Sequence, residues 1–255
     1  MNWSDTLAFR IADCGSRLCV GLDPRPESHS GAALGDWLRR VVDETAPHAA
    51  CFKPNAAYFE ALGSEGVRVL ERLCREWIPP EIPIIYDAKR GDIGETQKYY
   101  AKAAFEGLGA GSITLNPYLG FETLDPFLAY PDHGLYLLGV TSNPGAADLE
   151  LLPLADGGRV FERVAGFAAQ HAGQVGLVVG LTNAAAGVLE SIPDVPLLVP
   201  GLGAQGGDLK ALTAGGPRSA PIVINVSRGI LYDEPDLSFT EKARRYADQI
   251  AAVLG

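Results

Sequence analysis

The chain has 255 residues, of which 47% are hydrophobic and 20% charged, and this size allows one large domain with a well-buried core. Its net charge of −10, without runs of Lys or Arg, argues against non-specific nucleic-acid binding, although a few basic residues could still converge on a small anion. No apolar run approaches the roughly 20 residues of a membrane span, and the first residues do not resemble a signal peptide.

Short apolar runs alternate with longer amphipathic stretches along the chain, which is the rhythm of strand–helix units. We expect strands at residues 18–22, 50–52, 82–86, 112–115, 135–140, 175–180, 196–199 and 222–225. We expect helices at residues 3–12, 33–45, 57–77 (interrupted near Gly63 and Gly66), 94–108, 121–128, 158–171, 184–191, 208–213 and 240–254. Eight uniformly apolar strands with helices between them predict a TIM (β/α)8 barrel, as a single domain over residues 1–255.

The cysteines and histidines show no metal-binding pattern. The cysteines form no C-x-x-C pair, and no H-E-x-x-H or similar histidine pattern is present; the cysteines are Cys14, Cys19, Cys51 and Cys74. We therefore expect reduced, mostly buried thiols of a cytoplasmic protein, and no metal site.

The most informative stretch runs from Ile84 to Thr96, where an uncharged apolar run is followed within six residues by Asp87, Lys89, Arg90 and Asp92. Side chains alternate faces along a strand, so Asp87 and Lys89 should point the same way and form an ion pair. The structural alternative is a strand-end salt bridge followed by acids that suit the start of a helix.

Polar residues follow most of the expected strands, at the barrel rim where the active sites of this fold lie. They are Asp23, Lys53, Asp87, Lys89, Asn116, Ser142, Gln205 and Arg228. Each alone has a simple structural explanation, such as a turn, a loop cap or a surface ion pair. A barrel with only a structural role would not need polar groups at most strand ends, so we predict that they meet around one cavity.

The segment after the seventh strand contains Gly201-x-Gly203-x-x-Gly206, which matches the dinucleotide fingerprint literally. It lies late in the chain, and the position about 20 residues on is Asn225 rather than an acid. We favour a phosphate site, because the loops after strands seven and eight commonly hold phosphate in this fold. Arg228 would supply a charged contact and Gln205 a neutral donor.

These motifs together resemble the orotidine 5′-phosphate decarboxylase family, in its longer bacterial branch. The central match is Asp87-x-Lys89-x-x-Asp92-Ile93-x-x-Thr96. Supporting matches, in chain order, are Leu22-Asp23, Phe52-Lys53-Pro54-Asn55, Asn116-Pro117-Tyr118-Leu119-Gly120, Thr141-Ser142-Asn143-Pro144-Gly145, the segment Pro200 to Gly207, and Asn225 to Ile230.

The resemblance implies removal of CO2 from orotidine 5′-phosphate to give UMP, without metal or organic cofactor. It implies a charged array of Lys53, Asp87, Lys89 and Asp92. It also implies a homodimer in which Asp92 and Thr96 reach the neighbouring subunit's site. The substrate contacts that it implies are Asp23 and Lys53 with the ribose, Ser142 with the pyrimidine, Gln205, Ser227 and Arg228 with the phosphate, and further contacts from Ile93, Asn116 and Pro200.

The chemistry of this array follows from its charges. Loss of CO2 leaves an electron pair in the ring plane at C6, so Lys89 would attract that charge and then donate a proton. Asp87 would repel the substrate carboxylate, and both Asp87 and Asp92 would keep Lys89 protonated.

Three other functions stay open at this point. A Mg2+-dependent sugar-phosphate decarboxylase or aldolase-like relative would share the barrel, but it needs a further acid where strand two ends in Lys53. A catalytically silent nucleotide-binding barrel would not need the Asp87–Lys89–Asp92 array. A dinucleotide-dependent reductase ranks last.

Overall fold

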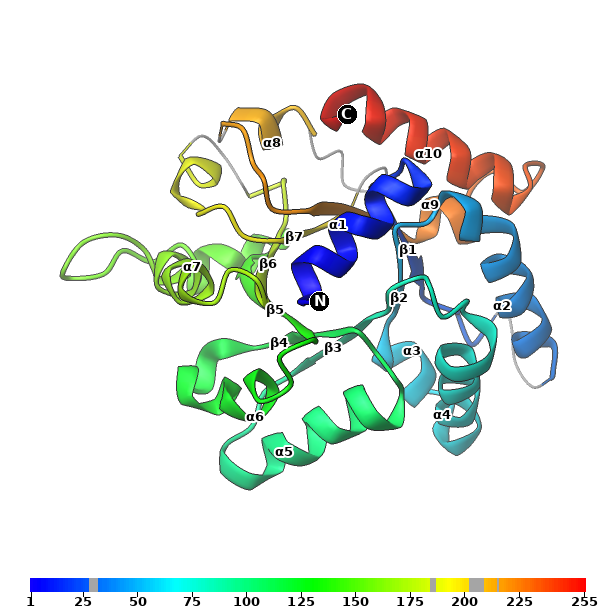
Figure 1. Cartoon of the computed structure of the whole chain (residues 1–255), viewed down its shortest axis with the longest axis horizontal. Coiled ribbons are helices and arrows are strands. Elements are labelled where there is room, and N and C mark those ends of the chain that lie inside the picture. Colours follow the sequence, from blue (N-terminus) through cyan, green and yellow to red (C-terminus); the bar gives the residue numbers. More distant parts are fainter. Residues whose placement is uncertain (28–31, 184–186, 202–208, 215) are drawn as a thin grey trace.

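The computed structural model describes residues 1–27, 32–183, 187–201, 209–214 and 216–255. Eight parallel strands form one sheet in the order β2-β1-β8-β7-β6-β5-β4-β3, and the parallel bridges Phe52–Ile84 and Asn55–Asp87 join its two edges. The strands are β1 Leu18–Leu22, β2 Cys51–Pro54, β3 Ile85–Arg90, β4 Ser112–Leu115, β5 Gly134–Val140, β6 Val175–Val179, β7 Leu197–Pro200 and β8 Ile222–Val226. The predicted TIM barrel is therefore confirmed (Figure 1).

Helices surround the barrel and bury its outer face. The α-helices are α1 Trp3–Cys14, α2 Ala32–Thr45, α3 Ala56–Glu60, α4 Gly63–Arg72, α5 Gly94–Lys102, α6 Asp125–Leu128, α7 Val160–Gln170, α8 Ala211–Ala214, α9 Arg228–Leu231 and α10 Phe239–Leu254. Single π-helical turns, η2 Leu73–Trp77 and η3 Ala103–Gly107, extend α4 and α5. The remaining 3-10 turns are η1 Ala46–His48, η4 Pro117–Leu119, η5 Phe121–Leu124, η6 Pro144–Asp148 and η7 Leu189–Ser191.

The third strand is where the predicted boundaries were most wrong. We expected residues 82–86, but β3 begins at Ile85 and continues through Lys89 to Arg90. Pro83 lacks a backbone N–H and cannot donate to a strand ladder, which favours a later start. Asp87, Lys89 and Arg90, which we placed after the strand, therefore lie within its last residues, whereas Asp92 follows it.

Two expected helices are seen only in part among the residues that the structure describes, and one short helix was missed. Of residues 184–191, the described part holds only the 3-10 turn η7, and α8 at Ala211–Ala214 overlaps the helix expected at residues 208–213 and ends one residue later. The helix α9, which begins at Arg228, was not predicted. A four-residue helix is too short to show a helical period in the sequence.

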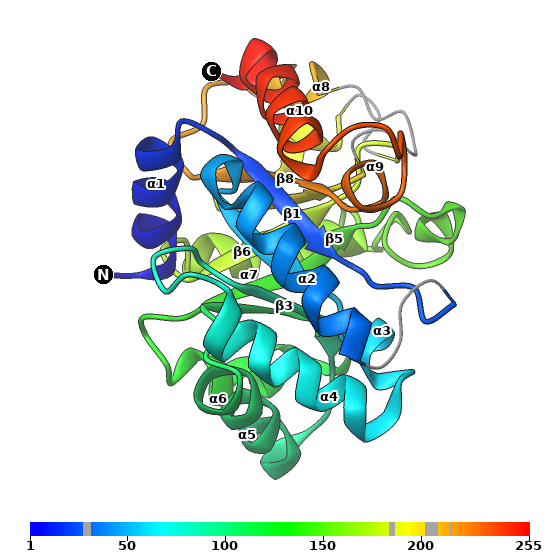
Figure 2. The same ribbon diagram turned by 90° about the vertical axis from the view of Figure 1, so that its right-hand side faces the viewer.

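Helix α1 closes the end of the barrel opposite to the carboxyl ends of the strands (Figure 2). Trp3 and Leu7 are fully buried and pack with inward-facing strand residues such as Tyr136 and Cys51. The indole of Trp3 also donates to the hydroxyl of Tyr136 at 3.3 Å. Because α1 covers this end of the barrel, the opposite rim is its open end.

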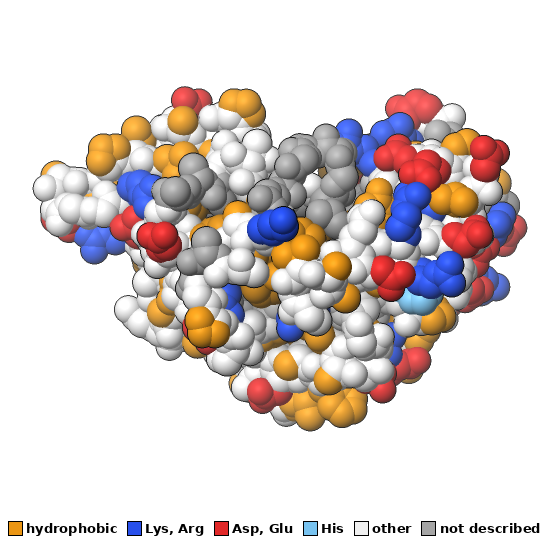
Figure 3. All heavy atoms as spheres, turned by 90° about the horizontal axis from the view of Figure 1, so that it is seen from above, with side chains coloured by type: hydrophobic (Ala, Val, Ile, Leu, Met, Phe, Trp, Pro, Cys, Tyr) orange, Lys and Arg blue, Asp and Glu red, His pale blue; other side chains and the backbone are white. Residues whose placement is uncertain are grey.

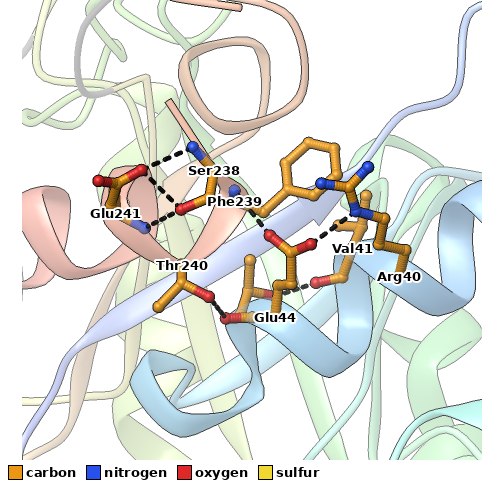
Figure 4. Close-up of polar contacts among 8 residues, drawn as sticks. Arg40, Val41, Glu44, Ser238, Phe239, Thr240 and Glu241 are labelled. Atoms are coloured by element: carbon orange, nitrogen blue, oxygen red, sulfur yellow. Dashed lines mark hydrogen bonds and ion pairs between the residues drawn. The ribbon is translucent and has the colours of Figure 1, made fainter. Parts of the chain in front are cut away.

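Helices α2 and α10 are joined by a polar contact at Glu44 (Figure 4). Its carboxylate accepts from the backbone N–H of Phe239 at 2.9 Å and pairs with Arg40 at 2.6 Å. A capping box formed by Ser238 and Glu241 starts α10 beside it. The first and last long helices of the barrel wall are thereby tied together.

On the face seen in Figure 3, Lys and Arg side chains are interspersed with Asp and Glu rather than gathered into one basic area. That pattern agrees with the net charge of −10. Within the described residues, no helix combines the length and apolar character that crossing a membrane requires.

Candidate active site

A cavity of about 500 Å³ opens at the carboxyl ends of the strands. Its lining combines charged residues from β2 and β3, residues from β4 to β7, and residues that follow β5: Lys53, Asp87, Lys89, Thr114, Leu138, Thr141, Ser142, Asn143, Glu150, Val178, Leu198 and Pro200. Lys53, Asp87, Lys89, Ser142 and Pro200 were predicted site residues, and the structure brings these five together.

Asp87 is the centre of the charged group. One carboxylate oxygen lies 2.6 Å from Nζ of Lys53, and the other lies 2.5 Å from Nζ of Lys89 and 3.0 Å from the hydroxyl of Thr114. Asp87 and Lys53 are both buried, whereas the Lys89 side chain is 47% exposed toward the cavity. The ion pair predicted between Asp87 and Lys89 is present, and Lys53 joins it.

The charges of these groups are stabilised by one another. Burial alone would raise the pKa of Asp87, but the two ammonium groups outweigh it and hold that pKa well below its usual range. Burial alone would lower the pKa of Lys53, but the carboxylates of Asp87 and Asp23 outweigh it and raise that pKa. The cavity floor therefore holds an ionised carboxylate between two charged amines.

Lys89 has an unusual backbone conformation, with φ of +46°. Left-handed backbone costs a non-glycine residue roughly 1–3 kcal/mol and persists where surrounding contacts enforce it. Here the backbone N–H of Lys89 donates to the Thr114 hydroxyl at 2.9 Å, and the same hydroxyl donates to Asp87. Thr114 thus holds both ends of the Asp87–Lys89 pair, a role that sequence reasoning missed.

Asp92, Ile93 and Thr96 lie outside the cavity, on the turn after β3 and the first turn of α5. Asp92 accepts from the backbone N–H of Ile93 at 2.8 Å, and no ion pair within the described chain joins it to Lys89. Ile93 is 63% exposed. Asn116, on the neighbouring loop, is also exposed and caps the N–H of Tyr118 at 3.0 Å, as a turn residue would.

The carboxyl ends of β8 and β1 carry the next group of predicted residues. Arg228 is exposed, begins α9 and forms no ion pair with a described residue. The Ser227 hydroxyl and one carboxylate oxygen of Asp23 are buried without a hydrogen-bond partner in the described structure. A Cβ on Gly21 would lie 2.7 Å from the Cβ of Ser227, so the glycine allows these strand ends to approach. Gln205 lies outside the described residues, as do Gly203 and Gly206.

The segment after β5 carries Ser142 and is held by two residues that were not predicted. The Glu150 carboxylate accepts from the backbone N–H of Thr141 at 2.7 Å. The Asn183 amide donates to the carbonyl of Thr141 at 2.8 Å and to that of Asn143 at 2.6 Å. Both residues lie in loops without periodicity, so no sequence signal pointed to them.

Comparison with known proteins gives a consistent result. Residues 16–243 match the model of the orotidine 5′-phosphate decarboxylase / HUMPS family. The chain is 44% identical over 271 aligned positions to the orotidine 5′-phosphate decarboxylase of Verminephrobacter eiseniae, covering all of this chain and 98% of that protein.

Two solved structures from Leishmania donovani are similar to the whole chain. The OMP decarboxylase is 38% identical with a TM-score of 0.87, and 99% of its length is covered. The UMP synthase is 40% identical with a TM-score of 0.88, and this chain spans 57% of that longer protein.

Proposed function

The chain belongs to the orotidine 5′-phosphate decarboxylase / HUMPS family, and from this membership we propose that it converts orotidine 5′-phosphate to UMP and CO2 in pyrimidine biosynthesis. The observation that carries the proposal is the Lys53–Asp87–Lys89 array on the floor of the cavity. It combines a cation that can stabilise a carbanion with an anion that can repel a carboxylate.

In the proposed reaction the bond between C6 and the carboxyl carbon breaks, and the electron pair stays on C6. The Lys89 ammonium group attracts this pair and then transfers its proton to C6, and solvent reprotonates the amine. Two unit charges about 4 Å apart interact by ~4 kcal/mol at an effective dielectric of 20. Enzymes supply roughly 8–23 kcal/mol, so Lys89 accounts for only a part.

Asp87 supplies a second part of the proposed catalysis. Its lowered pKa keeps it ionised at neutral pH, so it would repel a substrate carboxylate placed beside it. That repulsion would be relieved as CO2 departs. Lys53 neutralises Asp87 on the buried side, and Asp92 of a second subunit would keep Lys89 charged. These four residues are the proposed catalytic group.

Substrate binding is proposed around this group. Asp23 and Lys53 would hold the ribose, and the unpartnered buried oxygen of Asp23 supports this because it has a free acceptor. Ser142 would contact the pyrimidine, and Gln205, the Ser227 backbone and Arg228 would bind the phosphate. Pro200, Asn116, Ile93 and Thr96 complete the proposed set.

We also propose a homodimer in which Asp92 and Thr96 reach the partner's cavity. Large apolar side chains stand exposed near these residues, on the segment around α5 and on η4: Ile93 at 63%, Tyr99 at 66%, Tyr118 at 72% and Leu119 at 45%. Such a group of exposed side chains marks an interaction site more often than free surface. The free thiols of Cys19, Cys51 and Cys74 support a cytoplasmic location.

The test is an absorbance assay with orotidine 5′-phosphate, run with and without EDTA. We expect turnover that EDTA does not change. The donor set supports this, because both oxygens of Asp87 contact lysine ammonium groups, which leaves no free carboxylate there for a cation. No turnover would refute the decarboxylase, and turnover lost with EDTA would indicate the metal-dependent branch.

A further inference from the structure

Hydrogen bonds hold the backbone of the short segment from Thr141 to Asn143, but they do not involve the side chain of Ser142. Among the residues that the structure describes, no hydrogen bond uses the Ser142 hydroxyl, although Ser142 lines the cavity. Its backbone passes so close to β6 that a Cβ on Gly180 would lie 2.5 Å from the Ser142 nitrogen. The segment therefore presents a free hydroxyl from a rigid backbone.

Glu150 is the charged member of this arrangement. It is half-buried, it lines the cavity, and its carboxylate receives the Thr141 N–H at 2.7 Å. The Thr141 hydroxyl lies 2.9 and 3.1 Å from its two oxygens and 2.6 Å from Oδ1 of Asn143, so Glu150 and Asn143 share the one proton of this hydroxyl. The backbone N–H of Thr141 donates to Glu150, and hydrogen bonds to a charged acceptor are stronger than neutral ones.

Glu150 is itself anchored to the barrel wall. Its backbone carbonyl accepts from the N–H of Phe161 at 2.9 Å, and the Phe161 side chain is buried in the first turn of α7. The contact from α7 through Glu150 to Thr141 is thus a continuous chain of hydrogen bonds. It reaches the cavity beside Ser142.

We propose that Glu150 is a positioning residue that sets the preference for a pyrimidine base, by holding the Thr141–Asn143 segment so that Ser142 meets the base. The inference rests on the proposed function, in which Ser142 contacts the pyrimidine. Glu150 does not touch the substrate; it acts through Thr141. Its carboxylate accepts a hydrogen bond from the backbone N–H of Thr141, so its role is that of a hydrogen-bond acceptor.

The experiment compares the affinity for UMP with the affinity for ribose 5-phosphate, which has the sugar and phosphate but no base. Glu150→Ala should weaken UMP binding by about tenfold, the worth of one charged hydrogen bond, and leave ribose 5-phosphate binding unchanged. Glu150→Gln keeps an acceptor oxygen and should recover most of the loss. In kinetics, Glu150→Ala should raise KM for the nucleotide substrate more than it lowers kcat.

A matched control is Glu44→Ala, because Glu44 also accepts a backbone N–H from a distant element (Figure 4), and its helix α2 lies across the barrel from α7 (Figure 1). It should lower thermal stability without changing the ratio of the two affinities. Thr141→Val is a second test variant of similar shape that removes the hydroxyl shared between Glu150 and Asn143. It should shift the ratio in the same direction by about threefold, even if Glu150→Ala fails to fold.

The double variant Ser142→Ala/Glu150→Ala tests whether Glu150 acts through Ser142. We expect it to match Ser142→Ala alone in its affinity ratio, because the contact to be positioned is already missing. An unchanged ratio in Glu150→Ala or Thr141→Val, or additive losses in the double variant, would overturn the inference while the wild type still decarboxylates. A wild type without decarboxylase activity would instead overturn the proposed function.

Discussion

Replacing Asp87 with Asn should destabilise the barrel because it leaves two ammonium groups facing each other without their shared anion. Asp87 and Lys53 are 2.6 Å apart, and their side chains are only 8% and 6% exposed. The substitution keeps the shape of the side chain, removes its charge and replaces one acceptor oxygen with an NH2 donor. Any loss of stability therefore reports on electrostatics rather than on packing.

The magnitude follows from the burial of each pair. Removing one partner of a buried ion pair costs about 3–5 kcal/mol, since the other charge stays buried alone. The Lys89 side chain is 47% exposed, so its pair with Asp87 adds only about 0–1 kcal/mol. For a chain of this size the sum, about 3–6 kcal/mol, lowers Tm by about 6–24 °C.

The assay is chemical denaturation of wild type and Asp87→Asn between pH 7 and pH 3. The pKa of Asp87 is lowered in the folded state, so its stabilisation is fully present above the unfolded pKa of about 4. It is lost progressively as the pH falls from the unfolded pKa toward the lower folded pKa, so the difference in free energy of unfolding between the two proteins should begin to narrow below about pH 4. The double variant Lys53→Met/Asp87→Asn should recover much of the stability.

Two results would refute this reasoning. Equal stability of wild type and Asp87→Asn at pH 7 would mean that the carboxylate does not compensate Lys53. A gap that is constant down to pH 3 would mean that the loss is not electrostatic. Asp156→Asn is the control, because Asp156 pairs with Arg163 on the open surface and should leave Tm almost unchanged.

Three further outcomes are expected from the proposed site. Lys89→Ala should abolish turnover yet bind UMP within about tenfold of wild type, and near-normal turnover would remove its role as proton donor. Arg228→Ala should raise KM strongly, and added phosphite should accelerate decarboxylation of a truncated nucleoside by wild type but not by this variant; unchanged kinetics would place the phosphate elsewhere. Mixing inactive Lys89→Ala and Asp92→Ala chains should restore about a quarter of wild-type activity if sites are shared across a dimer, whereas no recovery would argue against sharing.

The parts of the fold that were predicted correctly are those with a strong local signal. The strands Leu18–Leu22 and Ser112–Leu115 match their expected limits, because each is an apolar run between turn residues. The start of β3 was misplaced because the apolar run at residues 82–86 begins while the chain is still outside the sheet. The length and hydrophobicity of an apolar run do not show which of its residues pair with the neighbouring strand.

The candidate site likewise contains residues that could be predicted from a local pattern and residues that could not. Asp87 and Lys89 could be paired from their spacing, since alternate residues of a strand share a face. Thr114, Glu150 and Asn183 could not be found, because their roles depend on contacts between segments that are distant in the sequence. A residue that acts by holding another residue leaves no motif of its own.

The left-handed backbone at Lys89 favours glycine for stability, whereas the proposed reaction requires lysine at this position. Between two inactive variants, Gly at this position should give the more heat-resistant protein than Ala, by about 1 kcal/mol, which reverses the usual ranking in a strand. A descendant of this chain that had lost its reaction would therefore tend to acquire glycine at residue 89. Retention of lysine there, despite its conformational cost, would be a signature of selection for activity.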